Sequence, residues 1–400
     1  MQSPHLWSAK WQPVVDQFLE NQSAGDDGAS LALVINGELV LSIAAGIGQN
    51  RVLNKKDIAW NENTLVNVFS AGKGLVAVCI LQLVQQGKLE LDKPVMHYWP
   101  EFAQFNKKDI TVKQVLIHRS GLSAFHQTIA QDQIFDWSLM THAITQDEPW
   151  WQPDSAQGYS PFIYGWILGE LIKRVAGAKS MNDYFQQAVA LPLNVDCFFG
   201  VPDKKLSQIV DTLPLKNMPL KKLSEIAVST SDADSFALGK IMKADPRGVT
   251  NRAFSNPISV MTSTNSLAWR QAQIPAANAH TNAIGLAKIY GDLASSTSRL
   301  LDKNTLSLCW QEQTFEMDKV LGLPLRFACG FMLSQAQRTD CRYGRGVRAF
   351  GHPGAGGSVG FANPDYQLGF GYTTQRMGQS LLIDQRAINL IDAIYTVLDK

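Results

Sequence analysis

Strand-forming segments occur at both ends of this chain, and helical segments fill its middle. Near the start, apolar runs at 30–35 and 38–44 flank Asn36-Gly37, a dipeptide typical of the tight turn of a β-hairpin. The short β runs that return near the end are 327–333, 357–361 and 367–373. We therefore expect one antiparallel sheet assembled from both ends of the chain, with helices packed on it.

Helical periodicity dominates the region between these strands and also marks both termini. The segments with this periodicity are 1–22, 71–86, 111–118, 161–176, 281–294 and 381–398. Gly87 suits the left-handed residue that ends many helices, so the helix at 71–86 is expected to stop there. Because 45% of the residues are hydrophobic, the chain can build a sizeable core.

The order of these segments predicts an α+β fold in a single domain over residues 1–400. We expect 1–69 and 325–400 to form an α/β subdomain around the sheet. The range 70–324 is expected to form a mainly helical subdomain, with an all-helical region in the middle of the chain. A cleft between the two is the expected place for a functional site.

Charge composition gives no sign of a polyanionic partner. The 36 lysines and arginines nearly balance the 35 acidic residues, for a net charge of +1. Neither nucleic acid nor a membrane surface is therefore an expected partner. No apolar run approaches the roughly 18 residues of a membrane span. The five cysteines contain no CxxC pair, so the sequence predicts no zinc or redox motif of that kind.

The expected location is the cytoplasm. Scattered cysteines, odd in number, are typical of reduced thiols. The first 22 residues lack the basic stretch and apolar run of a secretory signal. A periplasmic location would require that an export signal had been removed.

Ser70 and Lys73 form the first candidate site. The serine is expected to cap the helix at 71–86, with the lysine three residues later on the same face, so that their side chains can meet. A lysine whose pKa is lowered by burial can take the proton of a serine hydroxyl and make it a nucleophile. By itself this SxxK pattern is common, and it fits equally well an ordinary capping serine beside a solvated lysine.

Ser358 is a competing nucleophile, because Gly356-Gly-Ser358-Val-Gly360 matches the GxSxG pattern of α/β-hydrolases. In those enzymes the catalytic aspartate and histidine follow the serine in the chain. All seven histidines of this chain precede Ser358, and the last of them is His352. We therefore interpret these glycines as a strand edge that another backbone approaches closely.

Several motifs carry a resemblance to a known family. The segments concerned are 64–75, 87–94, 110–122, 158–170, 274–280 and 350–361. They resemble the serine β-lactamase and penicillin-binding-protein-like superfamily, and most of all its class C-like family VIII carboxylesterases. The resemblance implies a β-lactamase/transpeptidase-like fold. It also implies hydrolysis of a small-molecule ester, or of a β-lactam, through an acyl-enzyme, with no cofactor and no metal.

The resemblance assigns a role to each matching position. Ser70 would be the acylated nucleophile and Lys73 its base or electrostatic partner. Tyr159 would be the second proton-transfer group, a phenol that loses or shares its proton below its ordinary pKa. The helix start at Ser70 would supply one N–H group of an oxyanion hole, and Ala355 would supply the other.

The third motif of the family corresponds to His352-Pro-Gly354 here. His352 has either a structural role or donates a hydrogen bond toward Tyr159 or substrate. Pro161 stands where β-lactamases generally carry an asparagine, and His352 stands where they generally carry a lysine. Proline offers neither a side-chain amide nor an N–H, so two groups that would bind the amide and carboxylate of a β-lactam are missing.

Carboxylesterase activity is therefore the predicted function. The alternative enzyme is a β-lactamase or a D-alanyl peptide hydrolase, and the non-enzymatic alternative is a catalytically silent binding or scaffold protein of the same fold. The other histidines, among them His118, lack HxH and HExxH spacing and are interpreted as loop or core residues. Aromatic residues at 125, 150, 151 and 164 either line an acyl pocket or are simply packed.

Overall fold

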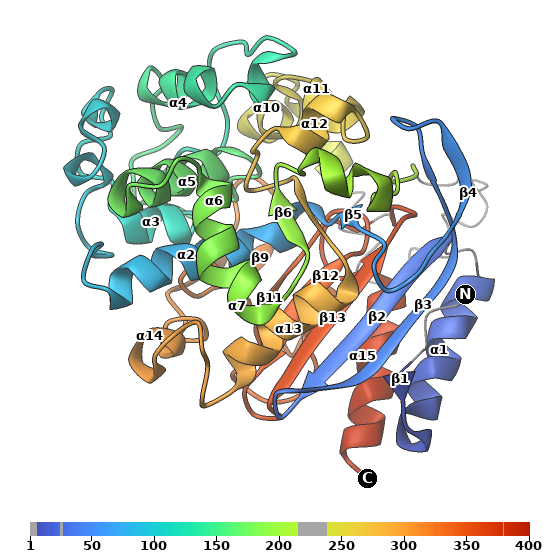
Figure 1. Ribbon diagram of the computed structural model, residues 1–400. Helices are drawn as coiled ribbons and strands as arrows, with labels where there is room; N and C mark the ends of the chain where they lie inside the picture. The colour runs from blue at the N-terminus through green and yellow to red at the C-terminus, as the bar shows by residue number, and fades with distance from the viewer. Residues whose placement is uncertain (1–5, 25–26, 215–237, 379) are drawn as a thin grey trace.

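The computed structural model describes residues 6–24, 27–214, 238–378 and 380–400, and its centre is an antiparallel sheet built from both ends of the chain (Figure 1). β2 (Gly28–Ile35) and β3 (Glu38–Asn50) form the expected hairpin, with Asn36 and Gly37 at φ angles of 53° and 80°. β13 (Leu368–Thr374) pairs antiparallel with β2. The sheet predicted from both termini is therefore confirmed.

Beyond β13 the sheet continues through the other C-terminal strands. In order across the sheet they are β12 (Val359–Asn363), β11 (Phe350–Pro353), β10 (Met332–Leu333), β9 (Pro324–Phe327) and β8 (Thr314–Met317). The run expected as one strand at 327–333 is two short strands, because Gly330 turns the chain at a φ of 84°. β12 starts at Val359 rather than at 357, because Gly356 and Gly357 have φ angles of 89° and 120°.

On the other side of β2, β3 pairs with two strands, β1 (Leu6–Trp7) and β4 (Lys55–Ala59). The α-helix of the first segment, α1 (Gln12–Ser23), therefore begins after β1 and a short 3₁₀ turn, and not at residue 1 as expected. Pro13 in its first turn fits this start, because proline has no N–H to leave unbonded there.

Helices pack on both faces of the sheet. α1 lies beside α15 (Gln385–Leu398), while α13 (Ala283–Ala294) lies on β13 and β2 (Figure 1). Alternate residues of β2 serve the two faces: Leu31 belongs to the α1–α15 core, and Ala32 to a cluster with α13. A Cβ at Gly369 of β13 would lie 2.1 Å from the backbone of α13, so glycine is what allows the helix to approach. α13 thus packs on the sheet although it falls within the range 70–324.

α2 (Lys73–Gln85) is buried along most of its length and forms the centre of the helical region. The helices that follow it along the chain in that region are α3 (Val112–Leu116), α4 (Trp137–Thr145), α5 (Ile163–Ala176) and α6 (Met181–Phe185). After α6 come α7 (Leu191–Leu193), α10 (Val249–Ser255), α11 (Ser259–Thr262), α12 (Leu267–Gln271) and α14 (Lys303–Ser307). The helix expected at 71–86 is confirmed, and α5 directly contacts it.

A second, three-stranded sheet lies within the middle of the chain, which is therefore not all-helical as expected. It consists of β5 (Val66–Asn67), β7 (Ala279–Thr281) and β6 (Cys197–Phe199). Strands of two or three residues are too short to give an alternating pattern in the sequence, which explains why they were missed. β5 leads directly into the segment that contains Ser70.

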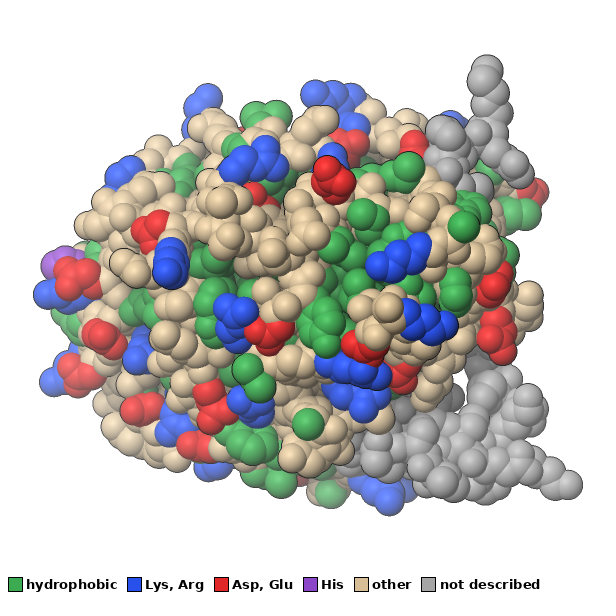
Figure 2. All heavy atoms as spheres, turned by 90° about the horizontal axis from the view of Figure 1, so that it is seen from below, with side chains coloured by type: hydrophobic (Ala, Val, Ile, Leu, Met, Phe, Trp, Pro, Cys, Tyr) green, Lys and Arg blue, Asp and Glu red, His purple; other side chains and the backbone are tan. Residues whose placement is uncertain are grey.

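Figure 2 shows one face of the molecule, seen from below, with basic and acidic side chains interspersed. This mixture agrees with the near-zero net charge. All five cysteines are buried, and none of them is joined to another in a disulfide. Among the described residues, no helix has the length and apolar character needed to cross a membrane.

A buried ion pair ties the end of β3 to the helical region. The guanidinium of Arg270, in α12, pairs with the Asp211 carboxylate, and the two side chains are 1% and 0% exposed. Arg270 also donates to the side-chain oxygen of Asn50, the last residue of β3, at 2.8 Å. The pair therefore links three segments that are distant in the sequence.

We expect Arg270→Ala to lower the free energy of unfolding by about 3–5 kcal/mol, because Asp211 would lose its buried partner and keep only the Arg51 N–H and the largely exposed Arg51 guanidinium. Arg299→Ala is the matched control: Arg299 pairs with Asp292, but its side chain is 65% exposed, so the loss should be at most about 1 kcal/mol. Urea unfolding followed by circular dichroism measures both. Equal losses in the two variants would contradict this expectation.

Candidate active site

Ser70 lies where the small sheet meets α2. The Val68 N–H donates to the Ala279 carbonyl at 2.8 Å and fixes the chain just before the serine. Phe69 then adopts a φ of 48°, a left-handed conformation that costs on the order of 1–3 kcal/mol. Ser70 is half-buried in a 3₁₀ turn, and the α-helix itself starts at Lys73. Ser70 is therefore not the N-cap that we expected, and its hydroxyl is free of any capping bond.

Lys73 is fully buried, and its Nζ has three polar neighbours. These are Ser70 Oγ at 3.0 Å, the Pro161 carbonyl at 2.8 Å and the Ala276 carbonyl at 2.9 Å. Burial lowers the pKa of Lys73 well below its ordinary value. A neutral amine has two hydrogens and one lone pair. In that neutral form the two carbonyls accept the hydrogens and the lone pair remains for the Ser70 hydroxyl, so a neutral Lys73 can take the serine proton.

Tyr159 lies beside both groups. Its ring centroid is 4.8 Å from Lys73 Nζ, and its hydroxyl hydrogen-bonds the side chain of Ser70. Its backbone N–H donates to the Asp318 carboxylate at 2.7 Å. The structure thus brings together the three residues that the sequence placed in the first two motifs.

The pKa of Tyr159 shifts in the direction opposite to the one we expected. Burial raises it above the ordinary value, the hydrogen bond to Ser70 lowers it in smaller part, and the negative charge of Asp318 raises it further. The two imidazoles near its ring, His118 and His352, supply no positive charge, because burial lowers the pKa of each. Tyr159 is therefore a protonated phenol at rest and can act as an acid.

His352, in β11, is 1% exposed, and burial lowers its pKa to about 3. Its Nδ1 donates to the Pro353 carbonyl at 2.7 Å, so the neutral ring carries its hydrogen there. Its Nε2 is a buried acceptor with no partner among the described residues. His352 therefore has no hydrogen left to donate to Tyr159 or to substrate, contrary to one of the two roles considered for it.

Two backbone N–H groups are available near the serine. Those of Ser70 and Ala355 have no acceptor in the described part of the chain. Gly354 lies against the backbone that precedes Ser70, since a Cβ on it would be 2.1 Å from the Val68 carbonyl oxygen. The glycine of the third motif thus lets β11 approach the serine turn. Two free N–H groups on such neighbouring segments can bind the oxygen of a developing oxyanion.

The hydroxyl of Ser358 makes no hydrogen bond to Ser70, Lys73 or Tyr159. Its side chain is buried, and its Oγ accepts the Thr374 N–H at 3.3 Å. Its carbonyl accepts the Gly354 N–H at 2.6 Å, so it braces the turn after β11. No lysine or histidine among the described residues hydrogen-bonds its hydroxyl, and nothing there would activate it.

Three groups at the site were missed by the sequence analysis. The Ala276 carbonyl binds Lys73, Asp318 binds the Tyr159 backbone, and the Nδ1 of His118 accepts the Ser160 N–H at 3.1 Å. A backbone carbonyl leaves no signal in residue types. Ala276 and His118 do fall within segments that carried the resemblance, which was a usable signal, whereas Asp318 lies outside all of them.

A small apolar pocket lies beside the second motif. Its apolar lining includes Phe125, Met140, Phe162, Ile163, Trp166 and Val260. Phe162 directly follows Pro161, whose carbonyl binds Lys73. The aromatic residue at 125 therefore does line a pocket, while Trp150, Trp151 and Tyr164 do not line this one.

Among the described residues, no group of three or more side chains could hold a metal ion.

Comparison with known proteins gives the family. The family described as Beta-lactamase matches residues 14–393. The chain belongs to the β-lactamase family. A solved structure described as a family VIII carboxylesterase superposes with a TM-score of 0.84, at 30% identity and 98% coverage of both chains. A penicillin-binding protein homologue from Caulobacter crescentus has the same TM-score and coverage at 29% identity.

A curated relative has a name that joins two activities. The esterase/beta-lactamase LipL of Mycobacterium tuberculosis is 26% identical over 372 residues, which cover 90% of this chain and 80% of that protein. This β-lactamase-family chain is thus similar to proteins described as esterases, to one described as a penicillin-binding protein homologue and to one whose name includes beta-lactamase. The family and fold inferred from the motifs are confirmed.

Proposed function

We propose that this β-lactamase-family protein is a serine carboxylesterase that hydrolyses small esters through an acyl-enzyme on Ser70. The observation that carries the proposal is the environment of Lys73, whose two carbonyl partners direct the remaining position of a neutral Nζ at the serine hydroxyl. The similarity to a family VIII carboxylesterase supports the same activity.

Acylation begins when Ser70 Oγ attacks the ester carbonyl carbon and its proton moves to Lys73 Nζ. The carbonyl electrons move to the oxygen, which the N–H groups of Ser70 and Ala355 bind. On collapse the bond to the alcohol oxygen breaks, and Tyr159 gives that oxygen its hydroxyl proton. The Lys73 ammonium then returns a proton to the Tyr159 phenolate. Water releases the acyl group in a second round of the same chemistry.

Preference for esters over β-lactams rests on the groups that the site lacks. Pro161 contributes only its carbonyl, and that carbonyl is bonded to Lys73. His352 has its single hydrogen committed to the Pro353 carbonyl. An ester needs only the nucleophile, its base and the oxyanion donors, whereas a β-lactam also presents an amide and a carboxylate that need partners.

The test of the proposal is active-site labelling. A fluorophosphonate probe should add covalently to Ser70 of the wild-type protein, as located by mass spectrometry of its peptides, and p-nitrophenyl butyrate should be hydrolysed. A protein that binds esters without turnover and resists the probe would instead be the silent binding protein considered as an alternative.

The pH dependence of kcat/KM should report Lys73. Only its neutral form can accept the Ser70 proton, so activity should be lost as the pH falls through its pKa and be fully present above it. Because burial lowers that pKa well below the usual lysine value, activity should already be high at pH values where ordinary lysines are charged. An initial-rate profile in mixed buffers checks this, and activity that appears only near the ordinary lysine pKa would contradict it.

A further inference from the structure

A carboxylate outside the three motifs is buried against Tyr159. Asp318 lies in the turn that joins β8 to β9, and its side chain is completely buried. No lysine, arginine or histidine pairs with it among the described residues. Burying a charge without a partner is costly unless hydrogen bonds replace its solvation. The contacts that Asp318 makes should therefore explain why it is there.

All its side-chain hydrogen bonds come from N–H groups of two segments. Oδ1 accepts the N–H groups of Val320 and Leu321, at 2.9 and 3.0 Å, within its own turn. Oδ2 accepts the Tyr159 N–H at 2.7 Å and the Gln157 side-chain amide at 3.4 Å. One carboxylate thus joins the turn at the sheet edge to the loop that carries the second motif.

We propose that Asp318 is a positioning residue for ester hydrolysis, which holds the Tyr159 hydroxyl where it protonates the departing alcohol. The inference rests on the proposed function. Tyr159 lies between this carboxylate, on its backbone side, and Lys73, whose Nζ is over its ring. The negative charge of Asp318 also opposes ionisation of the phenol and so keeps the proton on Tyr159 until an alkoxide is released.

None of the other charged and titratable groups that face Tyr159 among the described residues could position its hydroxyl in place of Asp318. Lys73 is engaged with Ser70 and two carbonyls, and His352 is a neutral acceptor. His118 packs on the Tyr159 ring but its Nδ1 accepts the Ser160 N–H, so it orders the neighbouring residue. Asp318 is therefore the group whose loss should act on Tyr159 itself.

The inference predicts an effect that depends on the leaving group. An alkoxide must be protonated as it departs, whereas p-nitrophenolate is a weak base that departs without help. Asp318→Asn removes the negative charge. It also places a side-chain NH₂ group opposite N–H groups whose hydrogen bonds the wild-type carboxylate accepts. We expect kcat/KM for ethyl butyrate to fall at least about 10-fold further than kcat/KM for p-nitrophenyl butyrate, since positioned acids contribute about 10²–10⁴-fold.

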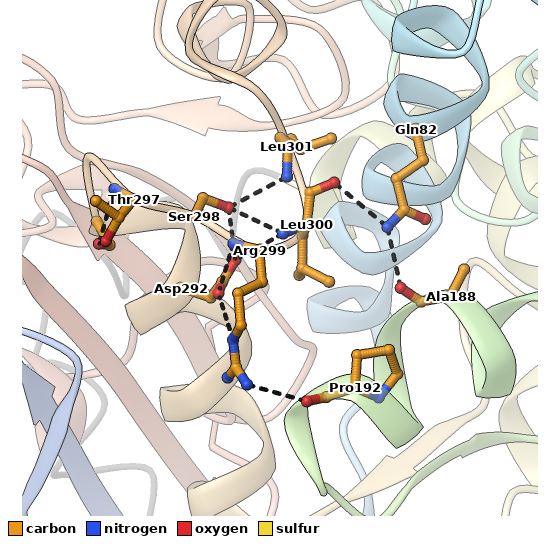
Figure 3. Close-up of polar contacts among 10 residues, drawn as sticks. Gln82, Ala188, Pro192, Asp292, Thr297, Ser298, Arg299, Leu300 and Leu301 are labelled. Carbon is orange, nitrogen blue, oxygen red and sulfur yellow. Dashed lines mark hydrogen bonds and ion pairs between the residues drawn. The ribbon is translucent and has the colours of Figure 1, made fainter.

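Asp292→Asn is the matched control, and Figure 3 shows its surroundings. Asp292, at the end of α13, likewise ties down a turn by accepting N–H groups, those of Arg299 at 3.0 Å and Leu300 at 3.1 Å. It holds the loop that follows α13 and belongs to no part of the active site. Its loss should lower stability and leave the ratio of the two esters unchanged.

The test compares the ratio of kcat/KM for ethyl butyrate to kcat/KM for p-nitrophenyl butyrate between the wild type and the variants. A ratio that shifts in Asp318→Asn, and in the same direction as in Tyr159→Phe, supports the inference. A ratio that stays at the wild-type value while both rates fall overturns it, because a purely structural carboxylate would lower the two alike. If the asparagine variant does not fold, Asp318→Ser, which is smaller and adds no NH₂ group, takes its place under the same criteria.

Failure of the proposed function looks different from failure of this inference. Fluorophosphonate labelling of Ser70 releases fluoride and needs no acid, so the folded Asp318 variants should still be labelled. Absence of labelling and of ester hydrolysis in the wild type would contradict the esterase itself. Normal labelling with an unchanged ester ratio would contradict only the role of Asp318.

Discussion

Ser70→Ala is expected to lower kcat/KM for p-nitrophenyl butyrate by about 10⁴- to 10⁶-fold, because it removes the atom that we propose forms the acyl-enzyme. Lys73 Nζ, 3.0 Å from Ser70 Oγ, then has no proton to accept. The fold should be retained, since Ser70 makes no capping bond to α2. Steady-state kinetics and intact-mass detection of the butyryl adduct measure the loss of rate and of the intermediate together.

Ser358→Ala is the control for that experiment. Ser358 sits in the competing GxSxG pattern, but its hydroxyl is buried and accepts the Thr374 N–H. We expect this variant to remain acylatable, with a rate close to that of the wild type. An adduct located on Ser358, or an active Ser70→Ala protein, would show that the nucleophile has been assigned to the wrong serine.

We expect the wild-type protein to hydrolyse p-nitrophenyl butyrate with a kcat/KM about 10- to 10⁴-fold above that for nitrocefin, since each of two absent contacts is worth roughly 1–3 kcal/mol. The absent contacts are an amide at Pro161 and a charged donor at His352. Three arginines that could in principle bind a lactam carboxylate are paired with carboxylates: Arg345 with Asp399, Arg348 with Asp365, and Arg376 with Asp27.

Pro161→Asn tests one of these contacts directly. Asparagine keeps the backbone carbonyl that binds Lys73 and adds a side-chain amide, so nitrocefin turnover should rise while ester turnover changes little. Pro153→Asn, a substitution of the same kind in the preceding loop, should change neither activity. Nitrocefin turnover that matches ester turnover in the wild type would reverse the preference that we propose.

The sequence by itself determined the first hairpin and the motifs, because both are local. Asn36-Gly37 specifies its hairpin through backbone conformations that few dipeptides adopt, and the structure has that hairpin at that place. The spacing of Ser70 and Lys73 requires only one helical turn to bring them within 3.0 Å. Family membership followed from the same short segments.

Only the tertiary structure decided the protonation of the site. The direction of the Tyr159 pKa depends on burial and on Asp318, which lies far from it in the sequence, and neither is visible in residue types. The same holds for Lys73, whose pKa is lowered by burial and whose Nζ donates to the carbonyls of Pro161 and Ala276. Solvation and charge act through space rather than along the chain. The spacing of the motifs therefore identifies which groups meet. The packing around those groups decides which of them carries the proton.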